Sequence, residues 1–287
     1  MSGPKFQHWV PCGYLKHFAI DGKVKGRDSR VYVTTIEECT DKKIAKVGGE
    51  NWTYSRSNPA LDHTFNDMEN DIPIIVGKII EGDQLDVKEK ISLMLIAFDL
   101  HHRSAAYDNK SSGERYSVYS KVSQQWLIEL CPNHLDPTDL NSYLNYLRDS
   151  WDLVVLTHEA SEKFVTSDHP SIVFADEDDG RPVLTILPVS PQQCIAIFDK
   201  ERIEVSVQKL TDHDVGLLNG LQAARCIKEI YSDHSLDSIE EMESAQELLK
   251  RTRPERYFSD TSYRPDYYTT DSAGFQKLDS IKRIPTD

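Results

Sequence analysis

Residues 164–173, Phe-Val-Thr-Ser-Asp-His-Pro-Ser-Ile-Val, place a tight polar corner between two short apolar runs of strand type. Pro170 restricts His169 to an extended backbone and removes one amide donor, so the corner is expected to be stiff. Ser167 and Asp168 belong to the residue types that hydrogen-bond nearby backbone amides in turns. The stretch therefore predicts either a well-capped β-turn or a corner that holds a carboxylate and an imidazole in a site.

The corner lies within a block of short β-rich runs. Acidic, glycine-containing and proline-containing connections separate these runs, as is typical of antiparallel hairpins. Together they predict one central antiparallel sheet of about five strands of typical length. The contributing segments are residues 153–157, 163–166, 171–174, 183–187, 194–198 and 203–207.

Helical patterns precede and follow this block. Pro73 is expected to kink or restart the helix that begins near Pro59, and Thr138 is expected to cap an amphipathic helix. Further helices are predicted over residues 86–103, 119–130, from Asp212, and over about 238–249. Helices on either side of a strand block predict an α+β fold, with helices packed on one side of the sheet. We expect one domain over residues 1–250 and a polar tail over 251–287, either disordered or draped over a surface.

The composition limits the classes of function. The 287 residues carry a net charge of −14, which disfavours nonspecific nucleic-acid binding and favours a basic protein partner. No apolar run approaches the roughly 20 residues that span a bilayer, and no secretion signal is visible. The five cysteines form no C-x-x-C pair, so neither a thiolate zinc site nor a disulfide framework is indicated. The chain is expected to be cytoplasmic.

The common nucleotide-binding and hydrolase motifs are absent, and the remaining candidate residues lie mostly at the ends of separate elements. In a hydrolase acting on a phosphodiester, His8 or His102 would be the general acid or base. Asp168 would orient that group or hold a divalent ion, and Arg103 would stabilise negative charge. Substrate would be bound by Asn219, Glu69, Tyr14 and His169.

Two other functions fit the same residues. In a non-enzymatic interaction protein, such as an inhibitor or a defence-system partner, Asp168 caps its own turn and His8 satisfies buried backbone. A small-molecule sensor would use the same pocket. Geometry separates these hypotheses: an open cleft shared by His8, Asp168 and Asn219 favours a site, whereas buried and mutually satisfied groups favour a structural clamp.

Several stretches together resemble an uncharacterised family, the domain of unknown function (DUF) 4238 family. The opening His8-x-x-Pro11-x-x-Tyr14-Leu-Lys-x-Phe18 is similar to its H-x-x-P-x-x-Y-L-x-x-F start, and residues 164–170 resemble its F-x-T-S-D-x-P signature. Residues 187–191, 218–219 and 230–232 resemble later elements, and Glu69 falls where the family has a glutamate.

Two departures are visible in this resemblance: Arg103-Ser104-Ala105 stands in place of R-T-P, and His169 in place of asparagine. The resemblance covers about residues 7–233. It implies a cytoplasmic protein of bacterial or phage origin, and it carries no assigned reaction. In the hydrolase hypothesis, such a protein would act in phage–bacteria conflict.

Overall fold

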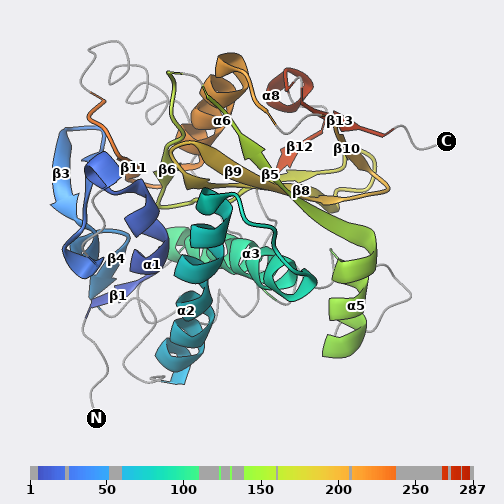
Figure 1. The fold of residues 1–287 in the computed structure, drawn as a ribbon, viewed down its shortest axis with the longest axis horizontal. Helices are drawn as coiled ribbons and strands as arrows, with labels where there is room; N and C mark the ends of the chain where they lie inside the picture. The colour runs from blue at the N-terminus through green and yellow to red at the C-terminus, as the bar shows by residue number, and fades with distance from the viewer. Residues whose placement is uncertain are drawn as a thin grey trace.

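A five-stranded sheet lies between two layers of helices (Figure 1). The structure is a computed structural model that describes residues 6–22, 26–51, 60–109, 123, 130, 139–159, 161–206, 209–236, 267–270, 273–278 and 280–284. The strand order is β12-β7-β8-β9-β5. Its strands are β5 (Trp151–Thr157), β7 (Ile172–Ala175), β8 (Pro182–Ser190), β9 (Gln193–Asp199) and β12 (Tyr268–Thr269).

Alternate side chains of this sheet enter two different cores. Val173, Leu187 and Ile195 face the helices α2 (Ala60–Glu81), α3 (Val87–Asn109) and α5 (Leu140–Ser150). Their neighbours Ile172 and Ile186 face α6 (Asp212–Arg225) and α8 (Ala273–Gln276). Every residue of β8 is buried, as expected for a strand covered on both faces. The prediction that helices pack on one side of the sheet is therefore wrong.

The mixed α+β class is confirmed, but the predicted strands do not all join one antiparallel sheet. Strand β6 (Thr166–Ser167) belongs to a second sheet of order β3-β2-β11-β6, and β10 (Ile203–Val205) pairs with β13 (Ile281–Arg283). In the five-stranded sheet, β12 runs parallel to β7. Local periodicity marks a strand without specifying its partner, because pairing depends on distant segments. The remaining strands are β1 (Phe6–His8), β2 (Arg30–Thr34), β3 (Cys39–Lys43), β4 (Gly49–Asn51) and β11 (Ile230–Ser232).

Helix α2 continues through Pro73, contrary to the predicted kink or restart. Helix α1 (Cys12–Leu15) packs against this point, where a Cβ on Gly13 would lie 3.2 Å from Cγ of Pro73. Helix α5 also differs from expectation, since the side chain of Asp139 accepts the amide of Asn141 at its N-terminus. Thr138, the predicted cap, lies outside the described residues.

The described part of the tail beyond residue 250 is integrated into the fold. Strands β12 and β13 pair with β7 and β10, and Phe275, Leu278 and Ile281 are buried in the core shared with α6. The predicted helix over residues 238–249 and most of that over 119–130 lie outside the described residues. Within the described ranges, no helix combines the length and apolar character needed to span a membrane.

Candidate functional site

The Thr-Ser-Asp-His-Pro corner is buried, and Asp168 is its centre. The Asp168 carboxylate is 0% exposed and accepts the amide of Ile227 at 2.7 Å. It also accepts the amides of Lys228 at 2.7 Å and Glu229 at 3.1 Å. The amide of Asp168 donates to the carbonyl of Glu229 at 3.0 Å. The side chain thus binds the whole connection between α6 and β11, and this connection is what places β11 beside β6.

The same corner is held from α6 by a glutamine that the sequence analysis did not single out. Gln222 is 0% exposed, and its amide nitrogen donates to the Ser167 hydroxyl at 2.5 Å and to the His169 carbonyl at 2.6 Å. Ser167 in turn accepts the amide of His169 at 3.0 Å. Gln222 follows Val215 and Leu218 at the i+7 and i+4 spacing of the buried helix face, and this position could have revealed it.

Asn219 and Tyr14 also hold backbone rather than line an open space. The Asn219 amide accepts the N–H of Val165 at 3.0 Å and donates to the carbonyl of Lys163 at 2.8 Å. The Tyr14 hydroxyl lies 2.7 Å from the Thr166 hydroxyl and donates to the carbonyl of Pro188 at 2.5 Å. Asn219 therefore fixes the segment leading into β6, and Tyr14 connects β6 itself to β8.

The second half of α3 adds a buried charged cluster beside the corner. Arg103 is 1% exposed and forms ion pairs with Glu69 at 2.5 Å and with Asp99 at 2.6 Å. The next residue, Ser104, donates its hydroxyl to the carbonyl of Asp168 at 3.0 Å. The two predicted residues Glu69 and Arg103 are thus brought together, and α3 is joined directly to the corner.

Two histidines of α3, His101 and His102, lie in the same region. Nδ1 of His101 lies 3.1 Å from Nε2 of His169, which connects α3 to the corner a second time. His102 lies 3.2 Å from the Ser123 hydroxyl, and burial lowers its pKa to about 3. His102 is therefore neutral at physiological pH.

His8 lies in a separate arrangement with Cys12. Its Nδ1 is 3.0 Å from the carbonyl of Val47, which selects the tautomer with a proton on Nδ1 and leaves Nε2 as an acceptor. Nε2 lies 3.4 Å from Sγ of Cys12. Burial lowers the pKa of His8 to about 4 and raises that of Cys12 to about 11, so both groups are uncharged at neutral pH.

Burial acts on Asp168 as well. Removal from water raises its pKa to about 7, while the three backbone donors act in the opposite direction by stabilising the carboxylate. Across the described part of the chain, no group of three or more His, Cys, Asp or Glu side chains has an arrangement suited to a metal ion.

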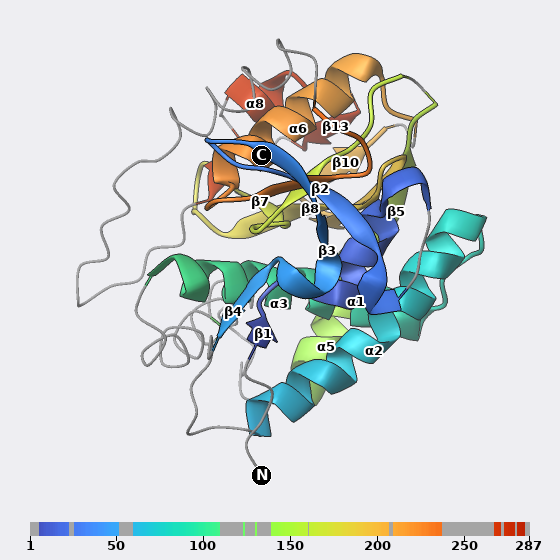
Figure 2. The ribbon, with the colours of Figure 1, turned by 90° about the vertical axis from the view of Figure 1, so that its left-hand side faces the viewer.

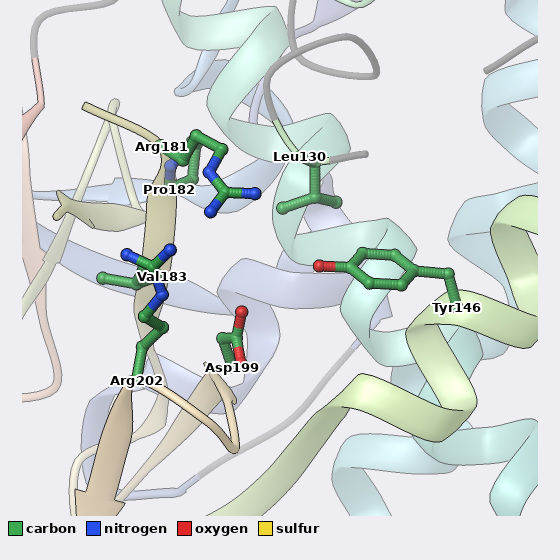
Figure 3. Close-up of a pocket in the computed structure, with 7 residues that line it drawn as sticks. All are labelled: Leu130, Tyr146, Arg181, Pro182, Val183, Asp199 and Arg202. Carbon is green, nitrogen blue, oxygen red and sulfur yellow. The ribbon is translucent and has the colours of Figure 1, made fainter. Parts of the chain in front are cut away.

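A small depression in the surface lies away from all of these residues. Its volume is about 190 Å³, including space open to solvent, and Figure 3 shows Tyr146 and Asp199 on opposite sides of it. Arg202, which also lines it, is paired with Asp176 at 2.8 Å. The remaining lining residues are Leu130, Arg181, Pro182 and Val183, so no sequence-predicted site residue contributes to it.

Comparisons with curated proteins and with solved structures return no match. The family model described as "Protein of unknown function (DUF4238)" matches residues 7–235, well over half of the chain. The polar corner and the residues that hold it all lie inside the matched range. This chain belongs to the DUF4238 family.

Proposed function

We propose that this protein acts by binding a basic protein partner, and that its polar corner is a structural clamp. The observation that carries the proposal is that Asp168, at zero exposure, accepts three backbone amides. A carboxylate that is bonded to backbone in this way and has no exposed surface is not in contact with a substrate in solution. The net charge of −14 supplies the complementary attraction for a basic surface.

The other predicted residues support the same proposal. Arg103 is neutralised by Asp99 and Glu69, so its charge is already compensated before any anionic substrate arrives. His102 is neutral and buried, which makes it a poor proton donor. A phosphodiester hydrolase would need these groups to face a common cleft. The hydrolytic hypothesis and the sensor hypothesis therefore draw less support from the geometry.

The decisive experiment compares Asp168→Asn with the unaltered chain in both kinds of assay. Affinity capture from a bacterial lysate should identify a partner, and the purified pair should form a stoichiometric complex that weakens as salt is raised. A variant that remains folded should bind that partner with unchanged affinity, since Asp168 does not face it.

Hydrolysis of nucleotides or nucleic acids is measured in parallel, with Mg²⁺ and with Mn²⁺. If the unaltered chain hydrolyses one of these substrates and folded Asp168→Asn does not, the proposal is overturned. The corner would then be catalytic. A complex whose affinity is independent of salt would refute the charge-based part of the proposal. The exposed Asp149→Asn serves as the matched control for removing one negative charge.

A further inference from the structure

The small depression between α5 and the ends of β8 and β9 is lined by charges of both signs. Figures 1 and 2 show α5 on the side of the sheet that carries α2 and α3, so the depression lies where the helical layer meets the sheet. Its charged residues are Arg181, Arg202 and Asp199. Figure 3 shows the hydroxyl of Tyr146 pointing toward the two guanidinium groups from α5. The depression therefore presents hydrogen-bond donors and an acceptor to the same space.

A single carboxylate holds the two guanidinium groups side by side. Oδ2 of Asp179 accepts Nε of Arg181 at 2.7 Å and Nη2 of Arg202 at 3.1 Å. Arg202 also donates through Nη1 to buried Asp176 at 2.8 Å. Among the described residues, neither Nη atom of Arg181 has a hydrogen-bond partner. The guanidinium of Arg181 is therefore fixed at Nε and keeps two donor nitrogens, the arrangement that binds a carboxylate through two hydrogen bonds.

Asp199 faces these donors without bonding to them. Its Oδ1 accepts the amide of Glu201 at 2.9 Å, whereas Oδ2 has no partner in the part of the chain that the structure describes. Burial raises the pKa of this carboxyl group, and the nearby charges of Arg202 and Arg181 act in the opposite direction. The three charges thus interact across the cavity, and a group that accepts from Arg181 and donates to Asp199 would join them.

We propose that this cavity binds a short aliphatic α-amino acid as its zwitterion. The carboxylate of the ligand accepts the Nη donors of Arg181, and its ammonium group donates to Oδ2 of Asp199. An anion without the ammonium group is repelled by Asp199, and a cation without the carboxylate is repelled by the two guanidinium groups. A ligand that carries both charges is therefore favoured over either single ion.

The size of the cavity and its apolar wall select the side chain of the ligand. The volume of about 190 Å³, including space open to solvent, is below the roughly 300–1,000 Å³ of pockets for drug-sized molecules. Leu130, Pro182 and Val183 supply the apolar part of the lining, and all three are buried. This space suits alanine or valine better than a long or aromatic side chain. The inference is independent of the proposed function, because no residue of the polar corner lines this cavity.

Isothermal titration calorimetry of the full chain with L-valine and with L-alanine tests the site. We expect a dissociation constant on the order of 0.1–1 mM, since ligands of this size have few atoms to contact the protein. Two analogues of valine separate its charges: isovalerate lacks the ammonium group, and isobutylamine lacks the carboxylate. Each should bind about tenfold or more weakly than valine, because each leaves one charged group of the cavity without its partner.

Variants of the two charged groups assign the binding to the cavity. Arg181→Gln should weaken valine binding about tenfold or more, whereas the matched control Arg148→Gln, at an exposed position of α5, should not. Asp199→Asn keeps an acceptor for the amide of Glu201 but removes the negative charge. It should weaken the binding of valine and strengthen that of isovalerate, with exposed Asp149→Asn as its matched control. Partial unfolding cannot produce this change of preference, because it weakens both ligands.

The absence of heat with valine and alanine, at about ten times the expected dissociation constant, would overturn the proposal. Equal affinity for valine and isovalerate would also overturn it, as would valine binding that Arg181→Gln and Asp199→Asn leave unchanged. Tighter binding of phenylalanine than of valine would contradict the assignment of a short aliphatic side chain.

Discussion

At the scale of single residues, three buried or half-buried side chains of this protein hold its backbone in place. Asp168 accepts three amides, Gln222 donates to a hydroxyl and a carbonyl, and Asn219 both accepts and donates. Such groups are costly to leave unpaired in a protein interior, so each is expected to have a large effect on stability.

Removal of the Asp168 carboxylate should destabilise the fold severely. Asp168→Ala leaves the amides of Ile227, Lys228 and Glu229 without their acceptor and opens a cavity at a fully buried position, so we expect a loss of about 3–5 kcal/mol in the free energy of unfolding. Asp168→Asn keeps one acceptor oxygen and should lose about 1–3 kcal/mol. Urea unfolding measures both values. The exposed Asp149→Ala should change stability by less than about 0.5 kcal/mol, and an equally small loss in Asp168→Ala would contradict the clamp.

His102 should make stability depend on pH in the acid range. Its folded-state pKa is about 3, below the ordinary value of 6.5, so the folded state binds fewer protons than the unfolded state between these values. The stabilising contribution is full above pH 6.5 and is lost as the pH falls toward 3. Between pH 7 and pH 4 the unfolding free energy of the unaltered chain should fall by roughly 3 kcal/mol relative to His102→Asn. Parallel stability curves for the two chains would argue against a neutral, buried imidazole.

At the scale of elements, α6 is attached to the segment that leads into β6. Asn219 supplies both hydrogen bonds of this attachment, to Val165 and to Lys163. Short strands such as β6 gain little from their own pairing, so their position depends on such side-chain contacts.

Asn219→Ala should therefore increase local opening of the segment leading into β6 under conditions in which the protein as a whole stays folded. We expect a loss of about 1–3 kcal/mol and faster hydrogen exchange at the amide of Val165, which loses its acceptor. Hydrogen-exchange mass spectrometry or NMR would detect the change at that amide. Asn145→Ala, an exposed substitution on α5, should leave exchange at Val165 as it was.

The sequence predicts elements better than it predicts their partners. The β-rich runs lie within a few residues of the observed strands, because alternation and turn residues are local signals. The pairing of β6 with β11 and of β12 with β7 depends on segments more than sixty residues apart, and no local pattern encodes it. The same limit applies to the site. The sequence marks Asp168 and Asn219 as candidate residues, but the backbone groups to which they bond come from elsewhere in the chain.

At the scale of the whole molecule, the end of the chain completes the second core. Phe275 packs against Phe174 with ring centroids 5.4 Å apart, and Arg283 is paired with buried Asp176. A chain that ends at residue 250 would expose the apolar face of β7 and leave that carboxylate with fewer partners.

We therefore expect the shortened chain to be several kcal/mol less stable and prone to aggregate, as judged by urea unfolding and light scattering. Phe275→Ala in the full chain should reproduce about 3–5 kcal/mol of this loss, and the exposed Gln276→Ala should have little effect. A shortened chain with an unchanged urea midpoint would instead place the domain boundary at residue 250.

The position of β11 also constrains how the protein is made. Strand β2 lies between β3 and β11, and Val33 is paired with Tyr231, so the N-terminal hairpin has one edge open until residues 230–232 have been synthesised. At roughly 5–20 residues per second, this interval lasts about 10–40 s on the ribosome. During that time an apolar strand edge is exposed on a nascent chain, where it can pair with another chain or be bound by a chaperone. The order of synthesis thus leaves the N-terminal hairpin incomplete until about four fifths of the chain has been made.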